Sequence, residues 1–150
     1  MGAALAILAA ATAPEHVQGL LLLAPAGLPL SKPVRTSAGD FVGQLARRTY
    51  PLADVVAGAR DLAASPRGFV RLARTLRRLD LSVEMGRVRR AGIPTRVVAC
   101  SSDTLVTPGH CRVAAEMLGA AYDEVDHPGG HVWVLRQPTL LDELVAATPD

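Results

Sequence analysis

The sequence predicts an α/β protein with a short, mostly parallel β-sheet, flanking helices and a helical insertion. Two short unbroken apolar runs, residues 17–23 and 95–100, have the pattern of strands that are covered on both faces, as in parallel sheets. Segments with helical periodicity alternate with these runs. Between the two runs, residues 28–90 carry most of the arginines and show helical rather than strand periodicity. These three observations favour an open α/β sheet interrupted by a helical segment.

The composition is that of a single domain of nearly neutral charge. The 150 residues suffice for one core, and because only 3% are aromatic, that core must consist mainly of Ala, Val and Leu. A net charge of +2 gives no reason to expect a nucleic-acid partner. Cys100 and Cys111 form neither a disulfide framework nor a zinc pattern. We therefore expect reduced cysteines, a cytoplasmic protein, no metal ion and no cofactor.

The first 29 residues predict a helix, a turn and a strand. Residues 2–12 are apolar nearly all round, which predicts a buried helix, and Pro14 ends it. Residues 17–23 then form the first strand, which stops at the turn of residues 24–27. No basic residue precedes the N-terminal apolar run, and the run is too short to cross a bilayer. We expect neither a signal peptide nor a membrane span.

Residues 30–90 are predicted to form a helical cap inserted into an α/β core of residues 1–29 and 91–150. Helices are expected over residues 40–49 and 52–64 and from Pro66 onward. In the third helix the apolar positions share one face, and four arginines occupy the other: Arg67, Arg71, Arg74 and Arg78. This basic face could bind an anionic substrate or nucleic acid. Because no aromatic residues interleave with the arginines, we interpret it as a solvated face.

After residue 91 the alternation of strands and helices returns. Residues 95–100 form a strand, and the helix after Pro108 is expected to end at Gly119. A third strand covers residues 122–125, and Pro138 opens the last helix. The side chains expected to face the core are those of Met85, Val113, Ala114, Met117 and Leu118. Trp133 either lines a pocket or packs against the last helix, and His110 and His127 are expected at the surface.

Asp103 and His131 each follow a predicted strand, at the sheet edge where functional groups of open α/β sheets gather. A carboxylate beside an imidazole fixes the ring tautomer and stabilises the imidazolium that forms when histidine takes a proton. Gly129 and Gly130 supply the backbone freedom that turns the ring over the edge. Each residue also has a plainer explanation, since Asp103 could cap a helix or a turn and His131 could be an ordinary loop histidine.

Three motifs in order resemble the α/β-hydrolase superfamily. Residues 99–108, ACSSDTLVTP, resemble its acid turn, where a strand ends at an Asp before a Val-x-Pro-like helix start. Residues 130–133, GHVW, with Pro138 seven residues after the histidine, resemble its histidine loop and final helix. Residues 20–27, LLLLAPAG, resemble its sixth strand and the turn into its cap. The family also places the acid before the histidine near the C-terminus.

This resemblance implies that the chain is the C-terminal part of the fold and that Asp103 and His131 are two members of a Ser-Asp-His triad. The family's nucleophile lies in Gly-x-Ser-x-Gly, before a helix of small residues. Met1 and Gly2 resemble the last two positions of that motif. We therefore expect the serine to be missing from this chain, directly before Met1, and the backbone N–H of Met1 to belong to the oxyanion hole.

The resemblance implies hydrolysis of carboxylic esters, with a small ester-like substrate that the cap selects. Thioesterases, haloperoxidases, epoxide hydrolases and acyltransferases share the scaffold, so the reaction type is less certain than the fold. The alternative is a non-catalytic fragment, a pseudoenzyme or binding module, or half of a split enzyme. The apolar strand at residues 20–23 would be an exposed sheet edge, which favours self-association or pairing with a complementing N-terminal half.

Overall fold

The computed structural model describes residues 2–29, 56, 60, 63–136 and 138–146. Its strands form a three-stranded parallel sheet of order β1-β2-β3. The elements in chain order are α1 (Gly2–Thr12), the 3₁₀ helix η1 (Pro14–His16), β1 (Leu20–Leu23), α4 (Pro66–Arg78), α5 (Ser82–Arg90), β2 (Thr95–Cys100), α6 (Pro108–Leu118), β3 (Ala121–Val125), the 3₁₀ helix η2 (Gly130–Arg136) and α7 (Pro138–Ala146). The predicted fold class, a short parallel sheet with flanking helices, is confirmed.

β2 lies in the middle of the sheet and is hydrogen-bonded on both sides. Val97 is in register with Leu22 of β1 and with Tyr122 of β3. The first strand is shorter than the predicted residues 17–23 because the N–H of Val17 donates to the carbonyl of Pro14 at 3.1 Å. This bond closes the preceding 3₁₀ turn and leaves only four residues to pair with β2.

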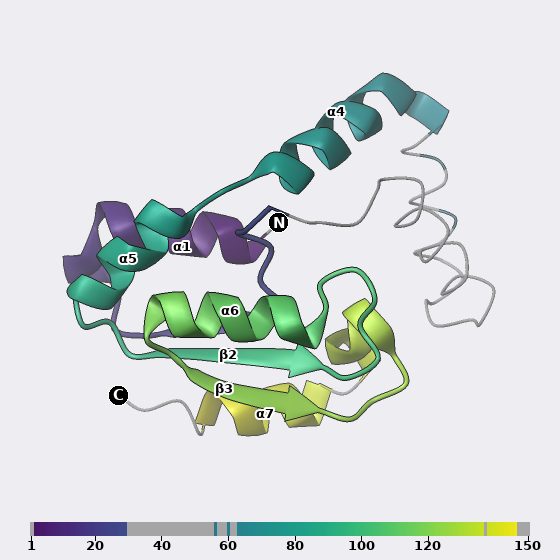
Figure 1. The fold of residues 1–150 in the computed structure, drawn as a ribbon. Coiled ribbons are helices and arrows are strands. Elements are labelled where there is room, and N and C mark those ends of the chain that lie inside the picture. Colours follow the sequence, from purple (N-terminus) through teal and green to yellow (C-terminus); the bar gives the residue numbers. More distant parts are fainter. Residues whose placement is uncertain (1, 30–55, 57–59, 61–62, 137, 147–150) are drawn as a thin grey trace.

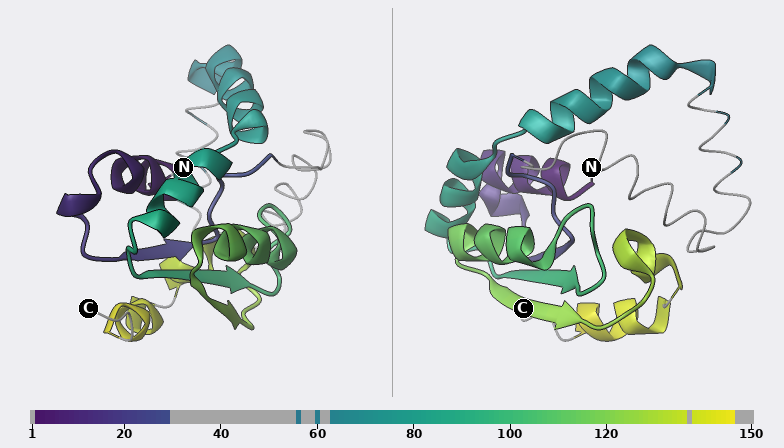
Figure 2. Two further views of the ribbon diagram at one scale, coloured as in Figure 1. Left: turned by 60° about the vertical axis from the view of Figure 1, so that its left-hand side comes forward. Right: turned by 45° about the vertical axis from the view of Figure 1, so that its right-hand side comes forward.

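Helices cover both faces of the sheet, as Figure 1 and both views of Figure 2 show. On one face α1, α5 and α6 pack against alternate strand residues such as Leu22 and Val97. On the other face η2 and α7 pack against Val98 and Cys100. Successive β2 residues therefore enter opposite core clusters, as the two-residue period of a strand requires. Both core-facing sets are fully buried, which explains why the run reads as continuously apolar.

Helix α5 belongs to the core layer, although the sequence placed residues 82–90 in the inserted segment. It packs against α1 and α6, and its Met85 and Val88 are fully buried. The N–H of Leu81 donates to the carbonyl of Gly27 at 2.7 Å, which ties the start of α5 to the end of the β1 turn. The core therefore begins near Leu81 on this side.

The remaining part of the predicted cap is described chiefly by α4, which extends away from the sheet layers (Figure 1). This helix begins at Pro66, as predicted. The predicted helix over residues 40–49 and most of the one over residues 52–64 lie outside the described residues. Among the described residues, no helix is long and apolar enough to cross a membrane.

Helix α6 ends as predicted, and Ala114 and Leu118 face the core as predicted, but the buried stripe is shifted from the predicted one. Its buried positions recur at three- and four-residue spacings: Cys111, Ala114, Ala115 and Leu118. Val113 was expected to face inward, and this prediction is wrong, since its side chain is 48% exposed. It lies off the stripe that the 3.6-residue period defines. Gly119 ends the helix in the left-handed conformation, with φ of 66°.

The N-terminal helix α1 is buried on one side only. Ala4, Ile7 and Ala10 are buried, whereas Leu5 is 63% exposed and Leu8 37% exposed. Helix α1 packs on α5, η1 and β1, and within the described sheet β1 is an edge strand. The sequence predicted a helix that is buried on all sides, whereas the structure exposes two of its leucines.

The left-handed conformation of Gly119 gives a stability prediction. We expect Gly119→Ala to lower the free energy of unfolding by about 1–2 kcal/mol, because an L side chain is disfavoured at positive φ. Its Cβ would also approach Cγ of Arg89 to 3.1 Å. Gly109→Ala is the matched control, since no atom lies within 4 Å of a Cβ there. Urea unfolding followed by circular dichroism should separate the two variants; equal midpoints would contradict the prediction.

Candidate active site

Asp103 lies in the turn that follows the central strand. The turn closes when the N–H of Asp103 donates to the carbonyl of Cys100 at 3.0 Å. The carboxylate is buried, and its Oδ1 accepts hydrogen bonds from the backbone N–H groups of Leu105 at 2.8 Å and Val106 at 3.0 Å. These bonds compensate part of the cost of burying a carboxylate and fix its orientation. They leave Oδ2 available for a further donor.

His131 supplies that donor. Its Nδ1 lies 2.7 Å from Oδ2 of Asp103, so the structure brings the two predicted site residues together. The carboxylate side chain is fully buried, whereas the imidazole is 34% exposed. With the Nδ1 proton directed at the carboxylate, the lone pair of the neutral ring is on Nε2. The arrangement therefore provides a base that solvent can reach, oriented by a buried acid.

Asp103 is not the N-cap of α6. That position is Thr107, whose side chain accepts a hydrogen bond from the N–H of His110 at 3.4 Å. Asp103 does organise a local turn, because Oδ1 accepts from residues two and three positions further on. The turn thus uses Oδ1, and the contact with His131 uses Oδ2.

Two serines join the acid turn to the histidine loop. The hydroxyl of Ser102 donates to the carbonyl of His127 and accepts from the N–H of Gly130 at 3.1 Å. The hydroxyl of Ser101 donates to Asp126 at 2.7 Å. These bonds hold the end of β2 beside the end of β3 and so fix the separation of Asp103 and His131. This role was not predicted, although two adjacent hydroxyls at the end of a predicted strand are a signal for it.

The two glycines before His131 have separate reasons to be glycine. Gly130 has φ of 58°, in the left-handed region that L side chains avoid. A Cβ on Gly129 would lie 2.6 Å from Nδ1 of His127 and 2.9 Å from Cα of Trp133. The first glycine in the pair is thus required by space and the second by backbone conformation. Together they let the chain enter η2 with the imidazole directed at Asp103.

The surroundings of the site differ from expectation at the other histidines. His127 is half-buried, and its Nδ1 accepts the N–H of Gly129 at 2.8 Å, so this histidine shapes the loop. His110 is also half-buried; its Nε2 has no hydrogen-bond partner among the described residues. Burial lowers the pKa of His110.

Trp133 is fully buried and packs with Val98 of β2 and Leu144 of α7. Of its two predicted roles, packing against the last helix is therefore the one that the structure shows.

Met1, the predicted oxyanion-hole donor, lies outside the described residues. No serine hydroxyl in the described part of the chain is hydrogen-bonded to His131. The same part of the chain contains no group of three or more His, Cys, Asp or Glu side chains placed to hold a metal ion. The placed functional groups are therefore the Asp103 carboxylate and the His131 imidazole.

Comparison with known proteins identifies the fold. No protein-family model and no curated protein matches the sequence. In structure, an α/β hydrolase enzyme from a Medee basin deep-sea metagenome library is similar, with a TM-score of 0.64 and 17% identity over 98% of this chain and 61% of that one. A second α/β hydrolase enzyme, from the sediment metagenome of the Mar Chica lagoon in Morocco, gives 0.65 and 17% over 97% and 55%. The thioesterase domain from the curacin biosynthetic pathway gives 0.55 and 18% over 97% and 62%.

The chain therefore has the α/β-hydrolase fold, and it spans less than two thirds of the length of each of these neighbours. The prediction that it represents a C-terminal part of this fold is confirmed. The identities, between 17% and 18%, explain why the relationship is visible in the structure and not in the sequence comparison. The catalytic roles of Asp103 and His131 stay predictions.

Cys111, which lies in α6, is predicted to be an unreactive thiol in the folded protein. Burial, together with the negative charges of Asp103 and Glu124, raises the pKa of the Cys111 thiol to about 12. At pH 8 only about one molecule in 10⁴ then carries the reactive thiolate. In a Cys100→Ala variant, where Cys111 is the remaining thiol, we expect no reaction with Ellman's reagent in the folded state and full reaction in urea.

The same shift predicts a pH dependence of stability. The folded-state pKa of Cys111 lies above the unfolded value. The contribution of the protonated, buried thiol to the free energy of unfolding is therefore complete below about pH 9 and is lost as the pH rises towards 12. Only the unfolded chain releases this proton in that window. Rapid stoichiometric labelling of the folded Cys100→Ala variant at pH 8 would contradict this account of Cys111.

Proposed function

We propose that this chain carries the acid and the base of an α/β-fold hydrolase that cleaves carboxylic esters with a Ser-Asp-His triad. His131 is the general base and Asp103 is the residue that orients it. The observation that carries the proposal is the 2.7 Å contact between His131 Nδ1 and Asp103 Oδ2, made by a part-exposed imidazole and a fully buried carboxylate. A surface ion pair would not need this asymmetry of burial.

The chemistry follows from that arrangement. His131 Nε2 takes the proton of a serine hydroxyl as the serine oxygen bonds to the ester carbonyl carbon. The Asp103 carboxylate stabilises the imidazolium, which then gives its proton to the departing alkoxide as the ester C–O bond breaks. Water repeats the sequence and releases the acid. We propose that the serine comes from outside the described residues, directly before Met1, and that the Met1 N–H binds the oxyanion.

Two further observations support this assignment. The turn and loop that carry the pair are hydrogen-bonded to each other through Ser101 and Ser102, which limits the movement of His131 relative to Asp103. The similar structures include proteins described as α/β hydrolase enzymes and a thioesterase domain. Because the chain spans less than two thirds of their lengths, the activity proposed here is that of the whole protein.

The position of the nucleophile is tested by the coding sequence upstream of Met1 and by kinetics. In-frame codons for Gly-x-Ser before Met1 support the proposal, and an in-frame stop codon at that position contradicts it. In a form that includes the serine, Asp103→Asn should lower kcat for p-nitrophenyl acetate by about 10⁴-fold, because the imidazole loses its orienting partner. His131→Ala should lower it at least as much.

His16→Ala is the control for these variants. The His16 side chain is exposed, and its Nε2 lies 3.7 Å from Oε1 of the exposed Glu15, so its replacement should leave kcat unchanged. Wild-type turnover in either Asp103→Asn or His131→Ala would refute the assignment of the triad. A form that contains the serine, is folded and has no esterase activity would favour the alternative of a non-catalytic protein.

We also propose that the edge of β1 and the exposed leucines of α1 form a self-association surface of the 150-residue chain. β1 is an apolar edge strand of the described sheet, and Leu5 is 63% exposed on α1, a helix that contacts β1. Analytical ultracentrifugation should show dimers or larger species, and Leu5→Lys should reduce them. Val83→Lys, at a 59% exposed position on α5, is the matched control. A monomer at all concentrations would refute this proposal.

A further inference from the structure

The loop between β3 and η2 sets the position of the His131 imidazole. β3 ends at Val125, which is in register with Cys100 of β2. The sheet therefore fixes Val125, whereas residues 126–130 lie beyond the strand and lead into His131. The separation of His131 from Asp103 thus depends on the contacts that hold residues 126–130.

Ser102 contacts this loop at two points. Its hydroxyl donates to the carbonyl of His127 and accepts the N–H of Gly130 at 3.1 Å, so one side chain uses both its proton and a lone pair. The thiol of Cys100 donates to the same His127 carbonyl at 3.2 Å. Side chains at and just before the acid turn therefore hold the loop near its start and at its end.

The contact with Gly130 has the larger consequence for the geometry of the site. Gly130 is buried, and a buried N–H without an acceptor is costly, so the Ser102 oxygen is the acceptor that this N–H needs. The φ of Gly130 is 58°, which turns the chain directly before His131. A rotation of the peptide between Gly129 and Gly130 would therefore displace the imidazole from Oδ2 of Asp103, which lies 2.7 Å from its Nδ1.

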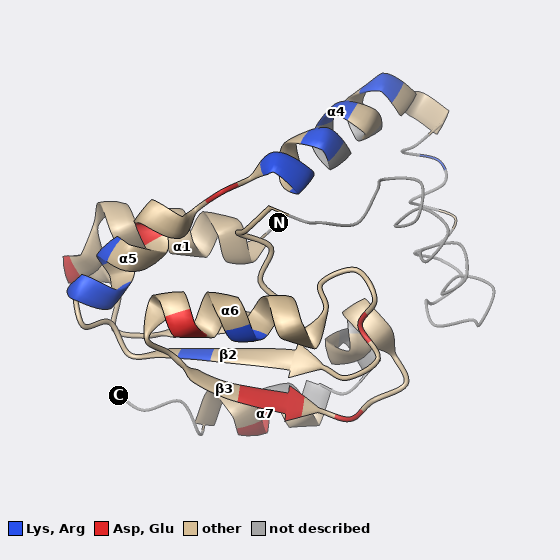
Figure 3. Ribbon diagram, viewed as in Figure 1, with Lys and Arg blue, Asp and Glu red and all other residues tan. Residues whose placement is uncertain are grey.

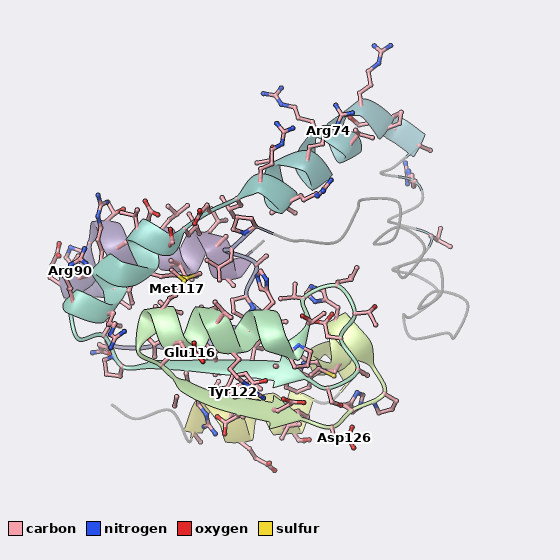
Figure 4. The ribbon with its side chains drawn as sticks, in the orientation of Figure 1. Arg74, Arg90, Glu116, Met117, Tyr122 and Asp126 are labelled. Atoms are coloured by element: carbon pink, nitrogen blue, oxygen red, sulfur yellow. The ribbon has the colours of Figure 1, made fainter. Side chains whose placement is uncertain are left out.

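Ser101 acts at a different place. Figure 3 shows acidic positions in the turn after β2 and directly after β3, and the second is Asp126. The hydroxyl of Ser101 donates to Oδ1 of Asp126 at 2.7 Å, and Figure 4 shows Asp126 at the end of β3. The backbone already joins these segments, because the N–H of Ser101 donates to the carbonyl of Val125 at 2.9 Å. The Ser101 hydroxyl thus reinforces a connection that the sheet makes, whereas the Ser102 hydroxyl bonds to backbone groups beyond the sheet.

We propose that Ser102 is a positioning residue, whose hydroxyl orients the Gly129–Gly130 peptide and so keeps Nδ1 of His131 within hydrogen-bond distance of Asp103. The hydroxyl bonds to the loop and not to the imidazole, so it acts through the loop. The geometric part of this inference stands on these contacts, and its effect on turnover rests on the proposed function. If His131 is the base, a displaced ring slows proton transfer without changing substrate binding, so the loss falls on kcat and not on KM.

Proton NMR of the 150-residue chain tests the geometric part. The Nδ1 proton of His131, identified by its absence from His131→Ala, should exchange slowly with water because it bonds to a buried carboxylate. Ser102→Val and Ser102→Thr introduce side chains of the same shape at an exposed position, and only threonine keeps the hydroxyl. We expect Ser102→Val to speed the exchange about fivefold or more, as the loss of one hydrogen bond does, and Ser102→Thr to stay within about twofold of the wild type.

Thr95→Val is the matched control. It removes a hydroxyl at the opposite end of β2, where Thr95 donates to the carbonyl of Ile93 at 2.9 Å, and should leave the exchange unchanged. The emission of Trp133, the only tryptophan, reports whether η2 is packed. If Ser102→Val loses the wild-type emission and Ser102→Thr keeps it, the hydroxyl is needed for folding and the positioning role is overturned. Equal exchange in the two variants, or rapid exchange of this proton in the wild type, also overturns it.

Kinetics separate this inference from the proposed function. In a form that includes the serine, Ser102→Val should lower kcat for p-nitrophenyl acetate by about tenfold to 10²-fold with KM unchanged, and Ser102→Thr should retain wild-type kcat. A wild-type form without esterase activity would count against the proposed function and leave the NMR result to decide the positioning role. An active form in which Ser102→Val keeps wild-type kcat would refute the positioning role and leave the proposed function intact.

Discussion

The parallel pairing of β2 with strands on both of its sides is the constraint on which the rest of the described structure depends. Val97 and Val98 are fully buried on opposite faces, so helices are required above and below the strand. Helices α1, α5 and α6 provide one layer, and η2 with α7 provides the other. Because all strands run in the same direction, the residues after β2 and β3 meet at one edge.

That edge explains how a carboxylate and an imidazole 28 residues apart become neighbours. The register of β2 and β3 brings the two strand ends together, and the bond from the N–H of Ser101 to the carbonyl of Val125, at 2.9 Å, extends the pairing by one step. Burial of Asp103 is tolerated because backbone N–H groups occupy one of its oxygens. The other oxygen is then directed at His131, and glycines in the loop allow the approach.

The described part of the molecule exposes two surfaces of different chemistry. The leucines of α1 and the edge of β1 are apolar, whereas α4 presents unpaired positive charge in the described part of the chain. The two surfaces differ in chemistry, since apolar area is stabilised by exclusion of water, whereas guanidinium groups are well solvated. They lie on different elements from the Asp103–His131 pair. Self-association and catalysis can accordingly be tested separately.

Local pattern determined a large part of this protein. The bounds of α1, the strand at Thr95–Cys100, the stop at Gly119 and the order of Asp103 before His131 were predictable, because periodicity, helix stops and strand ends depend on residues near one another in the sequence. The tertiary structure alone decided that α5 is a core helix, that Val113 points outward, and that Ser101 and Ser102 join two loops. Those outcomes rest on contacts between residues far apart in the chain, which strand register and helix packing set.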